Sequence, residues 1–488
     1  MHEGGLAVAY KTPGVYIKEI SVFPPSVAEV ETAIPAFIGY SEKAEEKGDD
    51  LTNTPRRIKS LVEYELYFGG APQPETLEVT LDATNTPTRV NVAHHYLMYY
   101  SLQLFFNNGG GDCYIVSVGP YAADGAKSRA ELEVGLDAVH KYDEPTLLLF
   151  PDAALLGGSD LTDLQKKALT QCATLQDRFG VFDLDEGSGH SAGVTAFRNN
   201  IGINDLKYGA AYTPHLKTSI PVQYRYQDIS LLQNAVAVTL DAVTTAAGVD
   251  GASVTAIDGA VTADDPQATI DALAVDLKNT NSIYASIVTA IQGGGMVLPP
   301  SGAVVGVYAR VDNDRGVWKA PANVSLNLVK GLTVPIDDAD QESLNIDVNA
   351  GKSINAIRAF TGKGMLVWGA RTLAGNDNEW RYVPVRRFFN MVEESVKKST
   401  SWAVFEPNSA PLWIKVKAMI ENYLIQKWRE GALAGAAPED AFFVKVGLGE
   451  TMTAQDVLEG RLIVEIGMAV VRPAEFIILK FSHKMQES

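Results

Sequence analysis

The stretch Ile34-Pro35-Ala36-Phe37-Ile38-Gly39-Tyr40 marks the point where the chain enters its folded body. A short apolar run of this kind is typical of a buried strand. The pattern that follows alternates helices and strands: a helix over 97–106, strands over 113–118 and 146–150, a helix over 161–179 and a strand over 181–184. Strands of about five residues separated by helices of about fifteen predict an α/β or α+β multidomain fold.

A strand-like segment stands near each end of the chain. Residues 12–20 (TPGVYIKEI) predict a turn and a strand, and residues 475–481 (EFIILKF) predict a second strand. Their strand-prone side chains are Val15, Tyr16, Ile17, Ile20, Phe476, Ile477, Ile478 and Leu479. Proline lacks a backbone donor and disfavours helix before it, so Pro24, Pro25 and Pro473 are predicted hinges. Apolar strands beyond such a break need a partner, and pairing between chains would make the protein a polymer subunit.

Length, hydropathy and cysteine content restrict the class of protein. With 488 residues the chain is too long for one compact core, so several domains are expected. No apolar run approaches the roughly 20 residues that cross a bilayer, so membrane insertion is not expected. No signal peptide is visible, which predicts synthesis and assembly in the cytoplasm. Cys113 and Cys172 lack metal-ligand spacing, so neither a disulfide framework nor a zinc site is expected.

The negative charge is concentrated in the first two thirds of the chain. The formal net charge is −18, and residues 346–488 hold 18 Lys and Arg against 16 Asp and Glu, so the first 345 residues carry −20. An acidic surface of this kind argues against a nucleic-acid partner for most of the molecule.

Composition and periodicity change again further along the chain. Residues 231–292 are rich in Ala, Val, Thr and Asp and contain almost no basic residues. They form either an insertion of helices and short strands on the outer surface or a partly mobile segment, and the sequence leaves both open. Beyond residue 346, helices are predicted over 386–398 and 411–429, and a long strand over 461–471.

The short motifs with catalytic or metal-binding character lack the context that their chemistry requires. Ser191 in the sequence GHSAG matches the nucleophile elbow of serine hydrolases, but a polar loop precedes it, so a serine hydrolase is only the alternative function. The sequence AGKS at 350–353 lacks the upstream glycine of a phosphate-binding loop. His94 and His95 are adjacent and cannot chelate one metal from a helix face, and residues 337–340 lack calcium-loop spacing. We therefore expect no enzyme activity, no cofactor and no metal.

Two groups of basic residues in the last third have two interpretations each. The first group contains Arg381, Arg386 and Arg387. These side chains either pair inside the domain or form a basic surface for an acidic protein partner. The candidate internal partners are Glu393, Glu394 and Glu406. The second group lies on the helix over 411–429 and contains Lys415, Lys417, Lys427 and Arg429. Its members form either a basic contact face or an ordinary solvated helix face.

Several long blocks of the sequence resemble the contractile tail sheath protein family. The blocks are residues 13–20 (PGVYIKEI), 299–323 (PPSGAVVGVYARVDNDRGVWKAPAN), 354–373 (INAIRAFTGKGMLVWGARTL), 380–389 (WRYVPVRRFF), 405–408 (FEPN) and 441–444 (AFFV). The resemblance is strong over 10–40 and 299–488 and weak over 41–298.

The resemblance implies a layered subunit. An N-terminal arm with the first strand (1–40) and the C-terminal third (346–488) would build an inner α/β core, which ends in a strand arm over 473–488. Residues 41–345 would form an outer domain inserted between them, with 231–292 as its variable part.

The resemblance also implies a function. Subunits of this family form stacked hexameric rings around an inner tube, exchange terminal strands with their neighbours, and contract to drive the tube through a target envelope. The implied partners are other copies of the chain, the inner tube protein, and baseplate and cap proteins. The candidate tube-facing or interface residues are Arg386, Arg387, Lys415, Lys417, Lys427 and Arg429. The particle would be a phage tail or a released extracellular injection system, with the second favoured; a surface-layer protein or adhesin would need a secretion signal.

Overall fold

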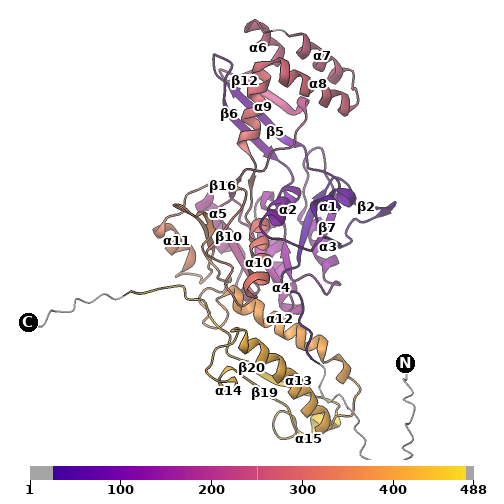
Figure 1. Cartoon of the computed structure of the whole chain (residues 1–488), viewed down its shortest axis with the longest axis vertical. Coiled ribbons are helices and arrows are strands. Elements are labelled where there is room, and N and C mark those ends of the chain that lie inside the picture. Colours follow the sequence, from indigo (N-terminus) through magenta and orange to yellow (C-terminus); the bar gives the residue numbers. More distant parts are fainter. Residues whose placement is uncertain (1–25, 250, 480–488) are drawn as a thin grey trace, which may run out of the picture.

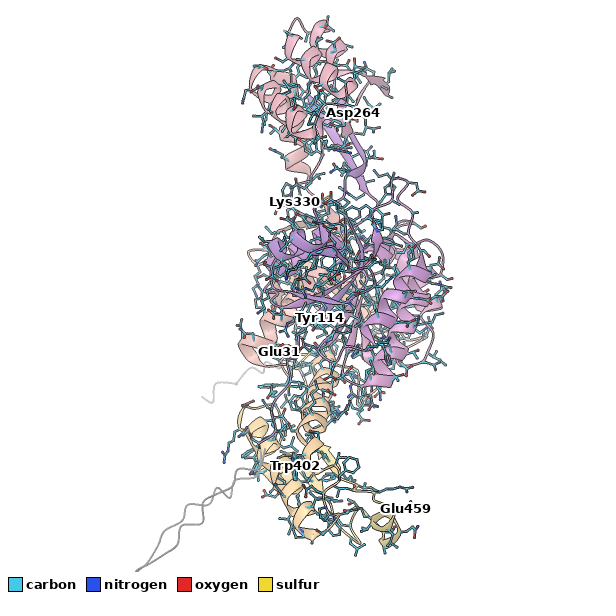
Figure 2. All side chains as sticks on the ribbon, turned by 90° about the vertical axis from the view of Figure 1, so that its right-hand side faces the viewer. Glu31, Tyr114, Asp264, Lys330, Trp402 and Glu459 are labelled. Atoms are coloured by element: carbon cyan, nitrogen blue, oxygen red, sulfur yellow. The ribbon has the colours of Figure 1, made fainter. Side chains whose placement is uncertain are left out.

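The computed structural model describes residues 26–249 and 251–479, arranged as three parts in a row along the long axis (Figure 1). A central body lies in the middle. The tip, built from residues 74–94 and 229–294, lies at one end, and the base, built from residues 383–471, lies at the other. Figure 2 marks Asp264 on the tip, Tyr114 in the body and Trp402 in the base. None of the helices that the structure describes is long and apolar enough to cross a membrane.

The body is organised by one nine-stranded sheet in the order β15-β18-β17-β10-β9-β8-β1-β7-β4. The strands are β1 (Pro35–Ser41), β4 (Arg56–Ile58), β7 (Cys113–Pro120), β8 (Leu147–Leu149), β9 (Phe179–Phe182), β10 (Gly209–Thr213), β15 (Val324–Ser325), β17 (Asn355–Phe360) and β18 (Gly364–Val367). The six strands from β7 to β17 run parallel, and antiparallel strands lie at both edges. The predicted α/β class is confirmed.

β1, which holds most of the apolar stretch over 34–40, lies inside this sheet, third from the edge formed by β4. β1 pairs with β7 on one side and with β8 on the other. The sheet therefore combines residues 35–41 with 56–213 and 324–367, and it continues across both predicted domain boundaries, at 40 and at 345. The assignment of these segments to an inner and an outer layer stays a prediction.

Helices cover both faces of the sheet, because alternate side chains of each strand point to opposite faces. Phe37 packs in one core with α1 (Leu61–Phe68), α2 (Met98–Asn107) and α10 (Ser301–Arg315). Ala36 and Ile38 pack in the other core, which contains α3 (Arg129–Val139), α4 (Asp160–Leu175), α5 (His190–Asn200) and α11 (Asp338–Asn345). Two apolar cores with a sheet between them explain why the sequence alternates short apolar strands with amphipathic helices.

Helices α2 and α10 lie unusually close together on the first face. A Cβ atom at Gly302 would come 2.5 Å from the carbonyl oxygen of Ser101, and one at Gly306 would come 2.6 Å from that of Phe105. These two glycines are one helical turn apart on α10, so only glycine permits this approach. Close helix packing therefore explains the two glycines in the family-like block over 299–323.

A buried carboxylate accepts hydrogen bonds at the N-terminus of each of these two helices. Asp152, which follows β8, accepts from the backbone of Tyr40 (2.8 Å) and Met98 (3.0 Å). Asp183, which follows β9, accepts from the backbone N–H of Ser301 at 2.8 Å. Burial raises the pKa of both carboxyls to about 6, although the hydrogen bonds act in the opposite direction.

Two separate segments of the chain enter the tip through a narrow neck. The tip sheet has the order β13-β12-β5-β6, and the two segments are joined where β12 (Ile229–Gln233) pairs parallel with β5 (Pro74–Leu81). The other tip strands and helices are β6 (Pro87–His94), β13 (Val236–Val238), α6 (Leu240–Ala246), α7 (Ala252–Thr262), α8 (Gln267–Thr280) and α9 (Ser282–Gly294). Of the two alternatives for residues 231–292, the structure therefore gives helices and short strands.

The neck is a three-stranded sheet of β14 (Val297–Leu298), β11 (Leu216–Thr218) and β16 (Val329–Leu332). Lys330 of β16, labelled in Figure 2, donates to the carbonyl oxygen of Gly293 at 2.7 Å. A cation at the carbonyl end of α9 is favoured by the helix dipole, so Lys330 helps to fix the tip on the body.

The base has its own apolar core between α12 (Val383–Ser399) and α13 (Ala410–Arg429), which confirms the two helices predicted there. The base also contains α14 (Pro438–Ala441), α15 (Ala454–Leu458) and an antiparallel pair of strands, β19 (Phe442–Lys445) and β20 (Glu465–Met468). The long strand predicted over 461–471 is thus only four residues long, because β19 offers four residues for pairing.

Candidate assembly interface

The predicted N-terminal strand, with Val15, Tyr16, Ile17, Ile20, Pro24 and Pro25, lies outside the described residues. The chain that follows it runs along α12. The backbone N–H of Ala28 donates to Ser399 Oγ at 3.0 Å, and that of Val30 donates to Ser395 Oγ at 3.1 Å. These serines lie one turn apart on the same helix face. Residues 26–32 therefore form a defined N-terminal root on the base.

Arg387 fastens this root to the body. Its guanidinium donates to the carbonyl oxygen of Thr32 at 2.9 Å and to Asp312 of α10 at 3.0 Å, and Thr32 Oγ1 donates to Asp312 at 2.6 Å. The Arg387 guanidinium also lies 4.6 Å from the ring centroid of Tyr308. Arg387 is buried, so one guanidinium joins the N-terminal root, α10 and α12.

Arg386 and Lys427 are buried and paired within this chain as well. Arg386 donates to Glu393 at 3.0 Å and lies 4.3 Å from the ring centroid of Trp380. Lys427 pairs with Glu430 at 2.7 Å and with Glu29 of the N-terminal root. Burial tends to lower the pKa of Lys427, but the hydrogen bonds to these two carboxylates outweigh it and raise the pKa.

The structure therefore removes three of the six basic residues from the expected contact surface. Arg386, Arg387 and Lys427 hold parts of one chain together. For Arg386 and Arg387 this agrees with the first interpretation of their group, whereas the buried Lys427 lies neither on a contact face nor on a solvated helix face. The spacing of cations on a helix does not reveal which segment packs over them, and here the N-terminal root does.

The other three basic residues stay available for contacts with another molecule. Arg429 is exposed, Lys417 is half-buried and 4.0 Å from Glu421, and the ammonium of exposed Lys415 lies 4.1 Å from the ring centroid of Trp402. These positions do not identify a partner, so a contact role for them stays a prediction.

The C-terminal segment is fixed by Glu475, which we group with Asn345, Arg371 and Tyr382 as the C-terminal root. Arg371 donates to both carboxylate oxygens, through Nε at 2.9 Å and Nη2 at 2.6 Å. Asn345 donates at 2.9 Å and the Tyr382 hydroxyl at 3.1 Å. Burial tends to raise the pKa of Glu475, but the bonds from Arg371 and Asn345 and the charge of Arg371 leave it below its usual value.

Beyond this root the chain exposes four consecutive apolar side chains. Phe476, Ile477, Ile478 and Leu479 are 66–80% exposed. They form no strand with the described part of their own chain. Their role as a strand for another subunit stays a prediction. Pro473, the predicted hinge, lies before the root.

The base itself is open beside its small sheet. A groove of about 780 Å³ runs along β20 and is lined by Val396, Leu412, Val464, Ile466 and Met468, among others. Phe405 lies on its rim, fully exposed and with a φ of 70°. Left-handed backbone is costly for a side chain with a Cβ, and such residues cluster at functional positions.

Within residues 26–249 and 251–479, no hydrogen bond joins the Ser191 hydroxyl to a histidine. This serine is exposed in the first turn of α5, and a loop separates it from β9. His215, a histidine that follows Ser191 in the sequence, makes its ring hydrogen bond to the carbonyl oxygen of Leu184 at 3.0 Å. Lys352 is buried and donates to the backbone of Arg198, as a structural lysine does.

One group of three carboxylates could hold a cation, as far as the described residues go: Asp143, Asp177 and Glu394, with oxygens within 4.8 Å. Lys398 already pairs with Asp143 at 2.6 Å and with Glu394 at 3.1 Å. Lysine therefore supplies the positive charge there, and the group joins the body to α12.

Sequence reasoning missed both ionic anchors, Arg387–Asp312 and Arg371–Glu475. Each joins residues that are 75 or 104 positions apart, so no local spacing could reveal it. The one available signal was a charged residue inside a family-like block, as for Asp312 and Arg371.

Together these features define a multidomain α/β protein whose apolar C-terminal segment lies outside its own fold. Residues 375–484 match the phage tail sheath C-terminal domain family. The chain is similar over 98% of its length to a chain of the anti-feeding prophage baseplate, 6-fold symmetrised (30% identity, all of that chain covered, TM-score 0.60).

Two further relatives are described as parts of a sheath. A chain in the PVC sheath complex of an extracellular contractile injection system, in the contracted state, is 29% identical with 98% of both chains covered and a TM-score of 0.61. The tail sheath protein of Vibrio phage KVP40 is 26% identical over 26% of this chain, and the match spans 19% of that curated relative's length. The chain belongs to the contractile tail sheath protein family.

Proposed function

We propose that this chain is the polymerising subunit of a contractile sheath, which stacks as six-membered rings around an inner tube. One observation carries the proposal. Of the 22 large apolar side chains that are exposed, 11 lie between residues 404 and 479, which make up about a sixth of the described chain. A concentration of this kind marks a surface that is covered by other molecules.

Strand addition supplies the link between subunits. The sheet of β19 and β20 has only two strands among the described residues, so each has an edge that can accept a further strand. Phe476–Leu479 of a neighbouring copy offers a strand of matching length with apolar side chains for the groove beside β20. Each main-chain hydrogen bond adds about 1 kcal/mol, and the bonds survive rotation of the subunits if the root can turn.

The particle is most consistent with a bacterial extracellular injection system. The similarity to chains of such systems extends over nearly the whole chain, whereas that to phage proteins covers about a quarter of it. Contacts with a tube, a baseplate and a cap follow from the same proposal, as does a structural rather than an enzymatic role.

Electron microscopy of the purified full-length chain tests the proposal. We expect long tubes with six-fold end views, and we expect folded, non-polymerising subunits when Met1–Val22 or everything after Arg472 is removed. Long tubes from either truncated chain would contradict strand exchange. Labelling by a fluorophosphonate probe that is lost in Ser191→Ala would instead support the hydrolase.

A further inference from the structure

The C-terminal segment is attached at two points, and the two points belong to different parts of the molecule. The backbone N–H of Val471 donates to the carbonyl oxygen of Ala432 in the base at 3.1 Å. Glu475 is held by Arg371 of the body at 2.6 Å. Within the described chain, the three residues between them, including Pro473, make neither hydrogen bonds nor ion pairs. Pro473 therefore lies in a short bridge from base to body.

The attachment to the body is strong and directional. Two parallel N–H···O bonds from a planar guanidinium to a carboxylate fix both distance and orientation. Arg371 is buried, and its third nitrogen, Nη1, donates to the carbonyl oxygen of Asn345 at 3.2 Å. Glu475 thus receives three donor groups in one fixed geometry.

Arg371 is in turn fixed to the central sheet. Its backbone N–H donates to Asn355 Oδ1 at 2.8 Å, and the amide of Asn355 donates back to the carbonyl oxygen of Arg371 at 2.8 Å. The same amide also donates to the carbonyl oxygen of Ala211 at 3.2 Å. Asn355 begins β17 and Ala211 lies in β10. The hydrogen bonds of Arg371 and Asn355 therefore connect Glu475 to two adjacent strands of the body.

The restraint ends at Glu475. The next four residues, Phe476 to Leu479, are largely exposed and form no hydrogen bond or ion pair with any described residue. The boundary between fixed and free chain therefore falls between Glu475 and Phe476, two positions beyond the proline expected to act as hinge.

We infer that the Glu475–Arg371 pair fixes the C-terminal arm (residues from Phe476 onward) to the body and carries the mechanical load on it. The arm then swings from Phe476 rather than from Pro473. A pull on residues 476–479 passes through Glu475 and Arg371 into β17 and β10, and so reaches the body directly instead of through the base. This inference rests on the proposed function, because only an arm held by a neighbour carries such a load.

The first test uses the unassembled full-length chain. Cys113 and Cys172 are buried, so a nitroxide can be attached selectively at Ala474→Cys or Ile478→Cys. We expect a restrained spectrum at 474 and a mobile one at 478. Glu475→Ala and the more conservative Glu475→Gln should both release the label at 474. Glu459→Gln, at a surface ion pair in the base, is the matched control and should change nothing.

The second test uses the assembled tubes. Arg371 is buried, so removing Glu475 leaves its charge uncompensated, and Glu475→Ala should lower tube yield by about tenfold or more. The exchanged pair Glu475→Arg with Arg371→Glu should recover part of that loss. Pro473→Gly should leave yield and contraction unchanged.

The outcomes separate the two proposals. If the label at 474 stays restrained in Glu475→Ala, or if Pro473→Gly alone blocks contraction, the anchor is wrong while the sheath function stands. If the wild-type chain forms no tubes at all, the proposed function fails, and the spin-label result still decides whether Glu475 holds the segment.

Discussion

The central body and the base differ in how completely they bury their apolar side chains. In the body, sheet residues such as Phe37, Leu148 and Val181 are covered on both faces by helices, and two cores close around one sheet. In the base, one core lies between two helices, while Phe405 and Phe443 face solvent beside a two-stranded sheet. The body buries most of its apolar side chains within one chain, whereas the base leaves several exposed, which the proposed sheath contacts would cover.

This difference separates stability from assembly. Burying one large apolar side chain contributes about 1.5–3 kcal/mol of free energy. In the body this burial takes place when the single chain folds. In the proposed sheath, the exposed apolar side chains of the base and the arm would be buried only when subunits assemble. Substitutions in the two regions should therefore alter different measurements.

The largest effect is expected in the arm. Replacing Phe476, Ile477, Ile478 and Leu479 by serine should abolish tube formation without lowering the melting temperature, because these side chains are 66–80% exposed in their own chain. The matched control is Val62→Ser with Leu66→Ser on α1, where two apolar side chains are also exposed, but on the body. Tubes at normal yield from the arm variant, or their loss in the control, would contradict the comparison.

A truncation in the body should act on folding instead. Leu148→Ala, in the middle of β8, should lower the free energy of unfolding by about 2–5 kcal/mol, because it leaves a cavity in the core that also contains Ala36 and Ile38. Urea unfolding of the isolated subunit measures the loss. Leu458→Ala on the exposed surface of α15 is the control and should stay within about 0.5 kcal/mol of wild type.

The buried carboxylates make the stability of the body depend on pH. Burial raises the pKa of Asp183 to about 6, above its ordinary 3.8, so this group's contribution to stability is fully present below pH 3.8 and is lost as the pH rises through 6. Asp183→Asn removes that dependence and can still accept the Ser301 N–H bond. Its stability relative to wild type should therefore improve by up to about 3 kcal/mol between pH 3.8 and 7.5. Unfolding curves that shift in parallel across this range would refute the assignment.

The smallest effect on folding is expected at Phe405. Phe405→Gly removes an exposed side chain from a left-handed backbone position, so the free energy of unfolding should change by less than about 1 kcal/mol. Tube yield should nevertheless fall, because the groove beside β20 loses part of its rim. A large loss of stability would show that Phe405 belongs to the fold rather than to the contact surface.

The body was predictable and the roots were not, for physical reasons. Apolar periodicity over 97–106 and 113–118 reports a local rule, since burial on one face of a helix or strand repeats along the sequence. The pairing of Arg387 with Asp312, or of Arg371 with Glu475, depends on where distant segments meet. Charge alone therefore left internal pairing and a basic surface both open for Arg386 and Arg387, and it did not indicate that Lys427 is buried.

The tip offers a place for added sequence. The turn from α7 to α8, which Asp264 marks at the far end of the molecule, consists of exposed residues over 262–266, and Asp264 already has a turn conformation with a φ of 55°. A peptide inserted there displaces no buried side chain, and each doubling of loop length costs only about 0.6 kcal/mol of closure entropy. In the proposed sheath, with residues 41–345 as the predicted outer layer, the insert would be displayed as a dense, regularly spaced array on the outside of the particle.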